Sequence, residues 1–297
     1  MRVIDDVELR RLLSMRAAID ALDAAFAAGV PPVPVRMHAT TPDGELLLMP
    51  SAAAQGLGVK LITLTEGNPE RGLPLVQGTY ALFSPGTQSP EAVLDGAALT
   101  SLRTGAVSGL ATRWLAREDA HRLVVFGAGV QARSHVEAVR AVRDIDDVAI
   151  VSRSPATAAA LAAEVGGRAG VADDVATADI VCTCTTSHIP VFDGARLAPG
   201  VHVNAVGAYT PESREVDTST VERARVVVET REVAMAEAGD LLLPIAEGAV
   251  DPGHVVADLS DVLSGAAVRR SPEDLTLFVS VGMAFEDLVV ARAALDA

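Results

Sequence analysis

The chain is poor in aromatic residues and in cysteine, and it has fewer basic than acidic residues, 24 against 39. Aromatic residues make up 3% of the 297 residues although 49% are hydrophobic, so alanine, valine and leucine must fill the core. This composition is typical of an alanine-rich α/β protein with two domains or one large one. The net charge of −15 argues against nucleic acid and anionic membranes as partners, and solubility explains it most simply.

Three further features narrow the class of protein. No run approaches the roughly 18 apolar residues of a membrane span, and residues 1–6 introduce charge before any apolar stretch, unlike a secretory signal. Cys182 and Cys184 lie two apart in an apolar run, and we interpret them as small strand residues in a reduced cytoplasm. The six histidines show no metal-ligand spacing, so no metal is expected.

An apolar run ends in a glycine turn within residues 123–132, which read Leu-Val-Val-Phe-Gly-Ala-Gly-Val-Gln-Ala. Gly127 permits the tight turn and Gly129 lets the backbone approach phosphates. Ala132 lets the following helix pack on the strand, with the helix N-terminus facing the anion. The sequence therefore predicts a site for the pyrophosphate of a dinucleotide.

The pattern along the chain changes near residue 117. Before it, helices are expected over 5–28, broken at an N-cap on Ser14, and over 97–116. Short strands between these helices favour an antiparallel or mixed sheet. They are expected at 45–49, 59–65, 78–83 and 91–94.

After residue 117, strands alternate with helices, which indicates a parallel sheet with crossover helices. The expected strands are 122–126, 147–151, 179–184, 201–206, 225–229 and 275–280, and the helices are 130–142 and 155–165. The fold class is therefore α/β, with a Rossmann-type dinucleotide-binding domain over 117–282. A smaller α+β domain is expected over 1–116, joined by an amphipathic helix within 283–297, and a homodimer is expected to form through it because its own core is small.

The residues after the strand 147–151 bear on the choice between NAD and NADP. An acidic residue at this strand end would bind the ribose 2′-hydroxyl of NAD, whereas an arginine suits the 2′-phosphate of NADP. Here Ser152, Arg153 and Ser154 follow the strand without an acid. An exposed loop arginine is the plain alternative, but two hydroxyls and a guanidinium favour NADP(H), with NAD(H) as second choice.

Three isolated cations stand among apolar neighbours in the first domain: Arg36, Lys60 and Arg103. A lone cation in an apolar strand usually extends its charged end to the surface. Three of them in one small acidic domain instead suggest a shared anion, such as a substrate carboxylate.

These segments resemble the ornithine cyclodeaminase/mu-crystallin family over nearly the whole chain. The matching stretches are Val35-Arg36 with Leu48-Met49-Pro50, Gly58-Val-Lys60, Arg71-Gly-Leu-Pro74, Leu99–Thr104, Phe126–Ala132, Asn204–Gly207, Arg214–Asp217 and Phe278–Gly282. The family pairs a dinucleotide-binding domain with a domain that binds substrate and dimerises.

The resemblance implies a role for each matching residue. Arg36, Lys60 and Arg103 would grip the carboxylate of a small amino or imino acid, with Lys60 as the catalytic proton donor or acceptor. Tyr209 and Val281 would lie beside the substrate. With the glycine motif, the positions expected to contact the dinucleotide are Arg103, Thr104, Gly127, Gly129, Val130, Gln131, Ala132, Ser152, Arg153, Ser154, Thr183, Thr185, Asn204, Ala205, Val206, Gly207 and Ser280.

One departure from the family pattern bears on the reaction. Cyclodeaminases carry a Gly-x-Asp-x-Pro-Gly-Lys pattern whose Asp acts as a base, but this chain has Tyr209 there and Glu212-Ser213 in place of Gly-Lys. A tyrosine, with an ordinary pKa of about 10, is a poor substitute for a carboxylate base at neutral pH. The chain thus resembles the imine-reducing branch, which converts 1-pyrroline-2-carboxylate or 1-piperideine-2-carboxylate to L-proline or L-pipecolate with NAD(P)H.

Three rival functions stay open at this point. One is an ornithine cyclodeaminase with tightly held NAD, and another is an alanine- or opine-type amino-acid dehydrogenase. The third is a non-catalytic protein that holds NADP as a structural group, against which the intact Arg36, Lys60 and Arg103 argue.

Overall fold

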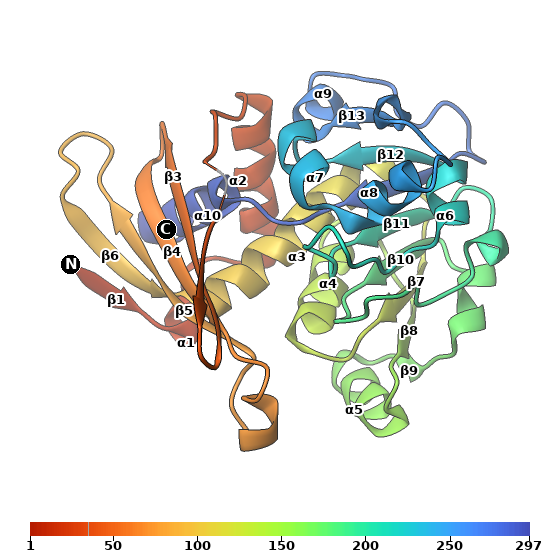
Figure 1. Ribbon diagram of the computed structural model, residues 1–297, viewed down its shortest axis with the longest axis horizontal. Coiled ribbons are helices and arrows are strands. Elements are labelled where there is room, and N and C mark those ends of the chain that lie inside the picture. The colour runs from red at the N-terminus through yellow and green to blue at the C-terminus, as the bar shows by residue number, and fades with distance from the viewer. Residues whose placement is uncertain (35) are drawn as a thin grey trace. The chain divides into compact units, whose positions relative to one another are not determined.

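The chain forms two compact units in the computed structural model, which describes residues 1–34 and 36–297 (Figure 1). Val35, one of the residues that carry the family resemblance, lies outside the described residues. The first unit comprises Met1–Arg103 and Met283–Ala297, and the second comprises Thr104–Gly282. No helix in the described ranges is both long enough and apolar enough to cross a membrane.

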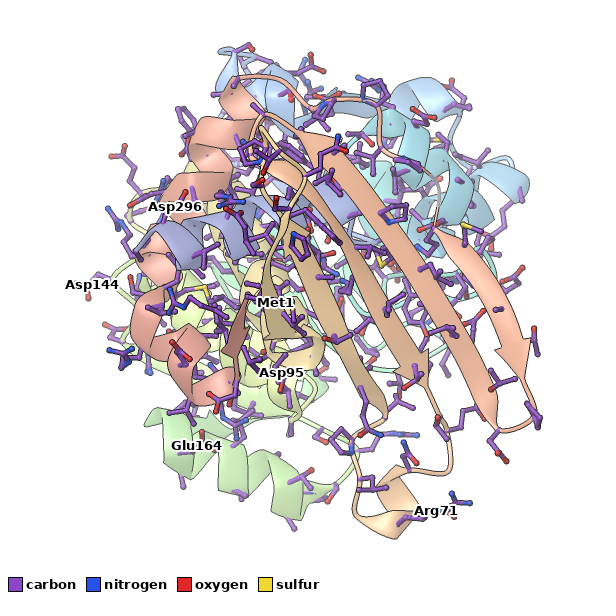
Figure 2. All side chains as sticks on the ribbon, turned by 90° about the vertical axis from the view of Figure 1, so that its left-hand side faces the viewer. Met1, Arg71, Asp95, Asp144, Glu164 and Asp296 are labelled. Atoms are coloured by element: carbon purple, nitrogen blue, oxygen red, sulfur yellow. The ribbon has the colours of Figure 1, made fainter. Side chains whose placement is uncertain are left out.

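The first unit is built on a mixed six-stranded sheet in the order β1-β6-β5-β4-β3-β2. Its strands are β1 (Arg2–Ile4), β2 (Met37–Thr41), β3 (Gly44–Ala53), β4 (Gly56–Leu64), β5 (Val76–Phe83) and β6 (Pro90–Asp95), with a 3-10 turn η1 at Pro69–Arg71. Figure 2 looks onto this sheet and labels Asp95 at the end of β6 and Arg71 in η1. The expected mixed sheet is confirmed: β1 pairs parallel with β6 and the other neighbours are antiparallel.

The edge strands β1 and β2 were not predicted from the sequence. β1 has only three residues, and all five residues of β2 are exposed, so β2 has no buried face and no alternating pattern.

Three helices complete the first unit together with the start of α3 (Gly96–Leu115): α1 (Asp6–Leu12), α2 (Met15–Ala27) and α10 (Ala284–Asp296). The expected break at Ser14 is confirmed, because the Ser14 hydroxyl accepts a hydrogen bond from the Ala17 amide at 3.2 Å. α10 packs on α2 and on β3, β4 and β5, and the rings of Phe26 and Phe285 meet edge to face at 5.6 Å.

The prediction that the last helix is amphipathic is wrong. Every residue from Ala284 to Ala291 is buried, and so is Ala294. Other elements of the first unit enclose this helix, so its sequence shows no polar stripe.

The second unit contains eight parallel strands in the order β13-β12-β14-β11-β10-β7-β8-β9. They are β7 (Arg122–Phe126), β8 (Asp147–Val151), β9 (Arg168–Ala169), β10 (Ile180–Thr183), β11 (His202–Ala205), β12 (Ala224–Val228), β13 (Val255–Asp258) and β14 (Leu275–Val279). The expected parallel sheet is confirmed, and β9 and β13 are additional short strands at its two edges.

Helices cover both faces of this sheet, because Leu123 and Val125 of β7 pack into one apolar cluster while Val124 and Phe126 pack into another. The helices are α4 (Val130–Arg140), α5 (Pro155–Val165), α6 (Thr218–Arg223), α7 (Arg231–Glu237), α8 (Gly239–Ala246) and α9 (Leu259–Leu263), with short 3-10 turns η2 (Ala172–Ala176), η3 (Gly194–Arg196) and η4 (Pro252–His254).

The division between the units falls inside α3, thirteen residues before the boundary expected near 117. The second half of α3 is bound to the second unit: Thr112 accepts a hydrogen bond from Asn204 at 3.0 Å, and Ser108 bonds His135 at 2.9 Å. A continuous helical pattern from 97 to 116 gave no sign of this change of partner.

Candidate active site

Lys60 is the only lysine among the 24 lysine and arginine residues of the chain. It lies in a cross-strand row on the inner face of the first unit's sheet, between Met49 and Tyr80, and the row continues through Leu94 to Ile4. Its neighbours in the row are apolar or aromatic, and Lys60 itself is 1% exposed. A buried ammonium at this position needs a counter-charge.

Two adjacent acids on α10, Glu286 and Asp287, supply that counter-charge. The Nζ of Lys60 lies 2.9 Å from Oδ1 and 2.8 Å from Oδ2 of Asp287. Arg103 donates from Nε to Asp287 at 3.2 Å and from Nη1 to Glu286 at 2.9 Å. Both acids are fully buried, and we call these four residues the buried charge cluster.

Burial and the neighbouring cations lower the pKa of Lys60 toward neutral pH. Burial is the main cause that lowers this pKa from 10.5 to about 8, and the charge of Arg103 lowers it further. The carboxylate of Asp287 acts in the opposite direction, and Arg36 adds a smaller lowering effect. Lys60 is therefore mostly an ammonium at pH 7 and releases its proton within reach of that pH.

Of the three cations singled out in the sequence, Arg36 and Arg103 both act electrostatically on Lys60. The anion that Lys60 and Arg103 share in the structure is the side chain of Asp287, which sequence reasoning missed. The Glu286-Asp287 pair stands in the first turn of a helix, where acids usually complement the helix dipole. Two adjacent acids at the start of a mostly apolar helix, and the single lysine of the chain, were the available signals in the sequence.

In the second unit, the glycine turn has the features that a pyrophosphate needs. Gly127 has φ of 109°, and a Cβ there would lie 2.4 Å from the carbonyl oxygen of Cys184, so the fold itself requires glycine. Gly129 caps α4, yet a Cβ there would meet nothing within 4 Å. The fold does not require the second glycine, and the space over the helix N-terminus is open to a ligand. Ala132 is fully buried and Val130 is 57% exposed.

In the loop after β8, the two serines make hydrogen bonds within the protein and the arginine is exposed to solvent. Ser154 caps α5 by accepting a hydrogen bond from the Thr157 amide at 3.4 Å, and Ser152 lies 3.2 Å from the Thr157 hydroxyl. Arg153 is exposed, and β8 ends at Val151 with no acid after it. The arginine is thus presented at the strand end expected to meet the adenine ribose.

The expected nicotinamide-lining residues separate into an interior set and a strand-end set. Thr183, Asn204 and Ala205 are completely buried, and the Asn204 amide donates to Thr112 at 3.0 Å. The Asn204 side chain therefore serves the interior of the second unit, and Val206 and Gly207 follow the strand end.

Glu215, which sequence reasoning did not assign to the site, joins two of these strand-end loops. Its Oε1 accepts hydrogen bonds from the amide and the hydroxyl of Thr185, both at 2.6 Å, and its Oε2 accepts one from the Gly207 amide at 2.6 Å. Burial raises the pKa of this carboxyl, although its hydrogen bonds oppose the rise. Its position in the Arg214–Asp217 motif was the signal for it.

Glu229 holds residues 280–282, the last residues of the second unit, through hydrogen bonds of the same kind. It accepts hydrogen bonds from the Ser280 hydroxyl at 2.6 Å, from the Val281 amide at 3.1 Å and from the Gly282 amide at 3.0 Å. Both Ser280 and Val281 are buried, whereas Tyr209 is 39% exposed. Two buried glutamates therefore fix the loops at the carboxyl ends of the parallel strands.

The model of the ornithine cyclodeaminase/mu-crystallin family matches residues 1–297. The chain belongs to this family. The resemblance identified from its motifs is thereby confirmed.

Individual family members agree with this assignment. The chain is 36% identical to a Delta(1)-pyrroline-2-carboxylate reductase of Bacillus cereus, over 98% of this chain and 95% of that one. Its structure is similar to that of the Thermococcus litoralis Delta(1)-pyrroline-2-carboxylate reductase in complex with NADH and L-proline, with a TM-score of 0.93, 34% identity, and 100% and 97% coverage. An archaeal alanine dehydrogenase dimer with bound NAD also gives a TM-score of 0.93, at 31% identity and 100% and 95% coverage.

Proposed function

We propose that this family member is an NAD(P)H-dependent reductase that converts 1-pyrroline-2-carboxylate or 1-piperideine-2-carboxylate to L-proline or L-pipecolate. The observation that carries the proposal is the buried Lys60, an amine with a pKa of about 8 beside the guanidinium of Arg103. Reduction of a C=N bond needs a protonated nitrogen and a neutralised carboxylate, and these residues provide both. The reductases of Bacillus cereus and Thermococcus litoralis support the same reaction class.

The cations of the first unit suit an anionic substrate. Lys60 and Arg103 lie together in the buried charge cluster, and Arg36 acts electrostatically on Lys60. A planar guanidinium binds a carboxylate through two parallel hydrogen bonds, and Lys60 holds a proton for the imine nitrogen.

The second unit fits a dinucleotide. The open space at Gly129 and the N-terminus of α4 would receive the pyrophosphate through backbone amides. Val130 and Gln131 would contact it, and the loops held by Glu215 and Glu229 would line the nicotinamide side. When bound, the reduced nicotinamide supplies the hydride.

The rival functions differ in their substrates and in the groups that they require. We place Tyr209 at the position of the cyclodeaminase base. Ring closure with loss of ammonia needs a carboxylate base there, and a phenol does not supply one. An alanine-type dehydrogenase would instead need free ammonia and an open-chain keto acid.

A substrate panel tests the proposal. The purified protein should oxidise NADPH or NADH when a cyclic imino acid is added, and the loss of nicotinamide absorbance measures this oxidation. It should form no measurable proline from ornithine. Ammonia release from ornithine, or pyruvate reduction with ammonium, at a higher rate than imine reduction would overturn the assignment.

The preference for NADPH over NADH is a finer proposal that rests on Arg153 and on the missing acid after β8. The Thermococcus litoralis reductase and the archaeal alanine dehydrogenase are described with NADH and NAD, so a preference for NADPH would distinguish this chain from them.

Replacing Arg153 by alanine should raise the KM for NADPH by about 10- to 100-fold and leave the KM for NADH unchanged. A charge-assisted contact with a 2′-phosphate contributes about 1.5–3 kcal/mol. The matched opposite change is Ser152→Asp, which should repel the phosphate and favour NADH. Equal losses with both cofactors in Arg153→Ala would show that the arginine does not select between them.

We also propose a homodimer formed through the first unit. A row of residues crosses the outer face of its sheet, in register from Pro50 through Val59, Ala81 and Val93 to Val3. All five are apolar, and Val3 is exposed, so this face is suited to pack against a second copy.

A further inference from the structure

We propose that Asp287 is a positioning residue that holds Lys60 as an ammonium at the substrate site and thereby sets the pH above which reduction fails. This inference deepens the proposed function and rests on it. The helix α10 thereby takes part in the reaction, although its two acids contact other side chains of the protein and not the substrate.

The contacts of Asp287 suit this role. Its two carboxylate oxygens lie 2.8 and 2.9 Å from the Nζ of Lys60, and Oδ1 also accepts a hydrogen bond from Arg103. The partner atoms come from strand β4 and helix α3, far from α10 in the sequence. One carboxylate therefore fixes the relative positions of the proposed proton donor and the proposed carboxylate-binding arginine.

Stability alone does not explain a charge at this position. Removing two charges from water costs more than their attraction returns in many proteins, and apolar replacements of a whole buried ion pair are often neutral or stabilising. The residues that flank the acids, Phe285 and Leu288, are completely buried and apolar. The helix could be packed without the acids, so their presence points to the cations that they hold.

The choice of lysine at position 60 points the same way. The chain uses arginine at each of its other basic positions, not counting histidine. Arginine does not lose its proton in proteins, whereas a buried lysine does so readily. The single place where the chain has an amine is the place where a proton can be released.

The charged groups near Lys60 act on its protonation in opposite directions. Arg103 from α3 and Arg36 from the segment before β2 favour the neutral amine, as does burial. Asp287 from α10 favours the ammonium, and Glu286 acts on Arg103. Tyr80, the cross-strand neighbour, has a pKa raised well above 10 by burial and by Asp287, so it stays neutral over the working range. Asp287 is thus the group among these that keeps Lys60 charged at neutral pH.

The chain offers a direct measurement because a protein grown on lysine labelled at Cε and Nζ gives a single side-chain NMR signal. Replacing Asp287 by asparagine should lower the pH at which this signal titrates by at least about one unit. The alkaline limb of kcat for 1-pyrroline-2-carboxylate reduction should move by the same amount. An unchanged titration of Lys60 in Asp287→Asn would overturn the proposal.

Glu286→Gln is the matched control, since Glu286 is the adjacent buried acid and binds Arg103. It should weaken kcat/KM while the Lys60 signal titrates within about half a unit of the wild type. Equal pH shifts in the two variants would show a general effect of removing buried charge and would contradict a specific role for Asp287.

If Asp287→Asn does not fold, Asp287→Glu keeps the charge and displaces it by one methylene. The Lys60 titration should then stay near that of the wild type, while kcat falls at least about tenfold because the ammonium is moved. A kcat equal to that of the wild type would overturn the positioning role. The titration needs no turnover, so a protein that reduces no imine would refute the proposed function and still test the hold of Asp287 on Lys60.

Discussion

Arg103→Ala should lower kcat/KM for a cyclic imino acid at least about 100-fold, because it removes charge-assisted hydrogen bonds to the substrate carboxylate. It should also destabilise the protein by about 3–5 kcal/mol, because Glu286 and Asp287 would lose a buried partner. Steady-state kinetics and urea unfolding, measured on the same preparation, check the two effects.

Arg103→Lys separates these two losses. It keeps the positive charge beside Glu286 and Asp287 but not the planar fork. We expect it to recover most of the lost stability and less than about a tenth of the lost kcat/KM. If Arg103→Ala turns over nearly as fast as the wild type, the carboxylate binds elsewhere.

The sequence predicted the second unit well because its strands are buried on both faces. Leu123 to Phe126 form a continuous apolar run that closes on Gly127, and no alternation has to be recognised. The edge strand β9 has two residues, too few for a pattern to emerge, and in β13 buried residues alternate with half-buried ones, so it lacks a continuous buried run. The change of partner inside α3 depends on contacts such as Thr112 with Asn204, which no local pattern shows.

The residues of the candidate site that have a local sequence pattern were predicted, and those that depend on distant contacts were not. Lys60 was found because a lone cation interrupts an apolar strand, and Gly129 because the glycine motif follows an apolar run and precedes a helical pattern. Asp287 was not found, because it lies 227 residues from Lys60 and stands where a helix commonly carries acids. Burial converts an ordinary helix-start acid into the partner of the only lysine, and burial of α10 follows from the tertiary fold.

Lys60→Arg should lower kcat by a factor on the order of 10² to 10⁴, the usual contribution of a general acid or base. The guanidinium keeps the charge beside Asp287 but does not release its proton. Lys60→Met, which removes the charge as well, should lose at least as much activity. Single-turnover rates with preloaded NADPH check this step, and a Lys60→Arg variant with half of the wild-type rate would rule out proton transfer by Lys60.

The burial of Lys60 also predicts how stability changes with pH, and Lys60→Met is the reference. The folded pKa of about 8 lies below the ordinary value of 10.5, so between these pH values the unfolded chain binds more protons at this site than the folded protein. The free energy of unfolding of the wild type should therefore rise relative to Lys60→Met, by about 2–3 kcal/mol between pH 8 and 10. Below about pH 7 the amine is protonated in both states, and the difference should be constant. Urea midpoints of the two proteins across this range measure the rise, and parallel curves would mean that the amine of Lys60 titrates in the folded protein as it does in water.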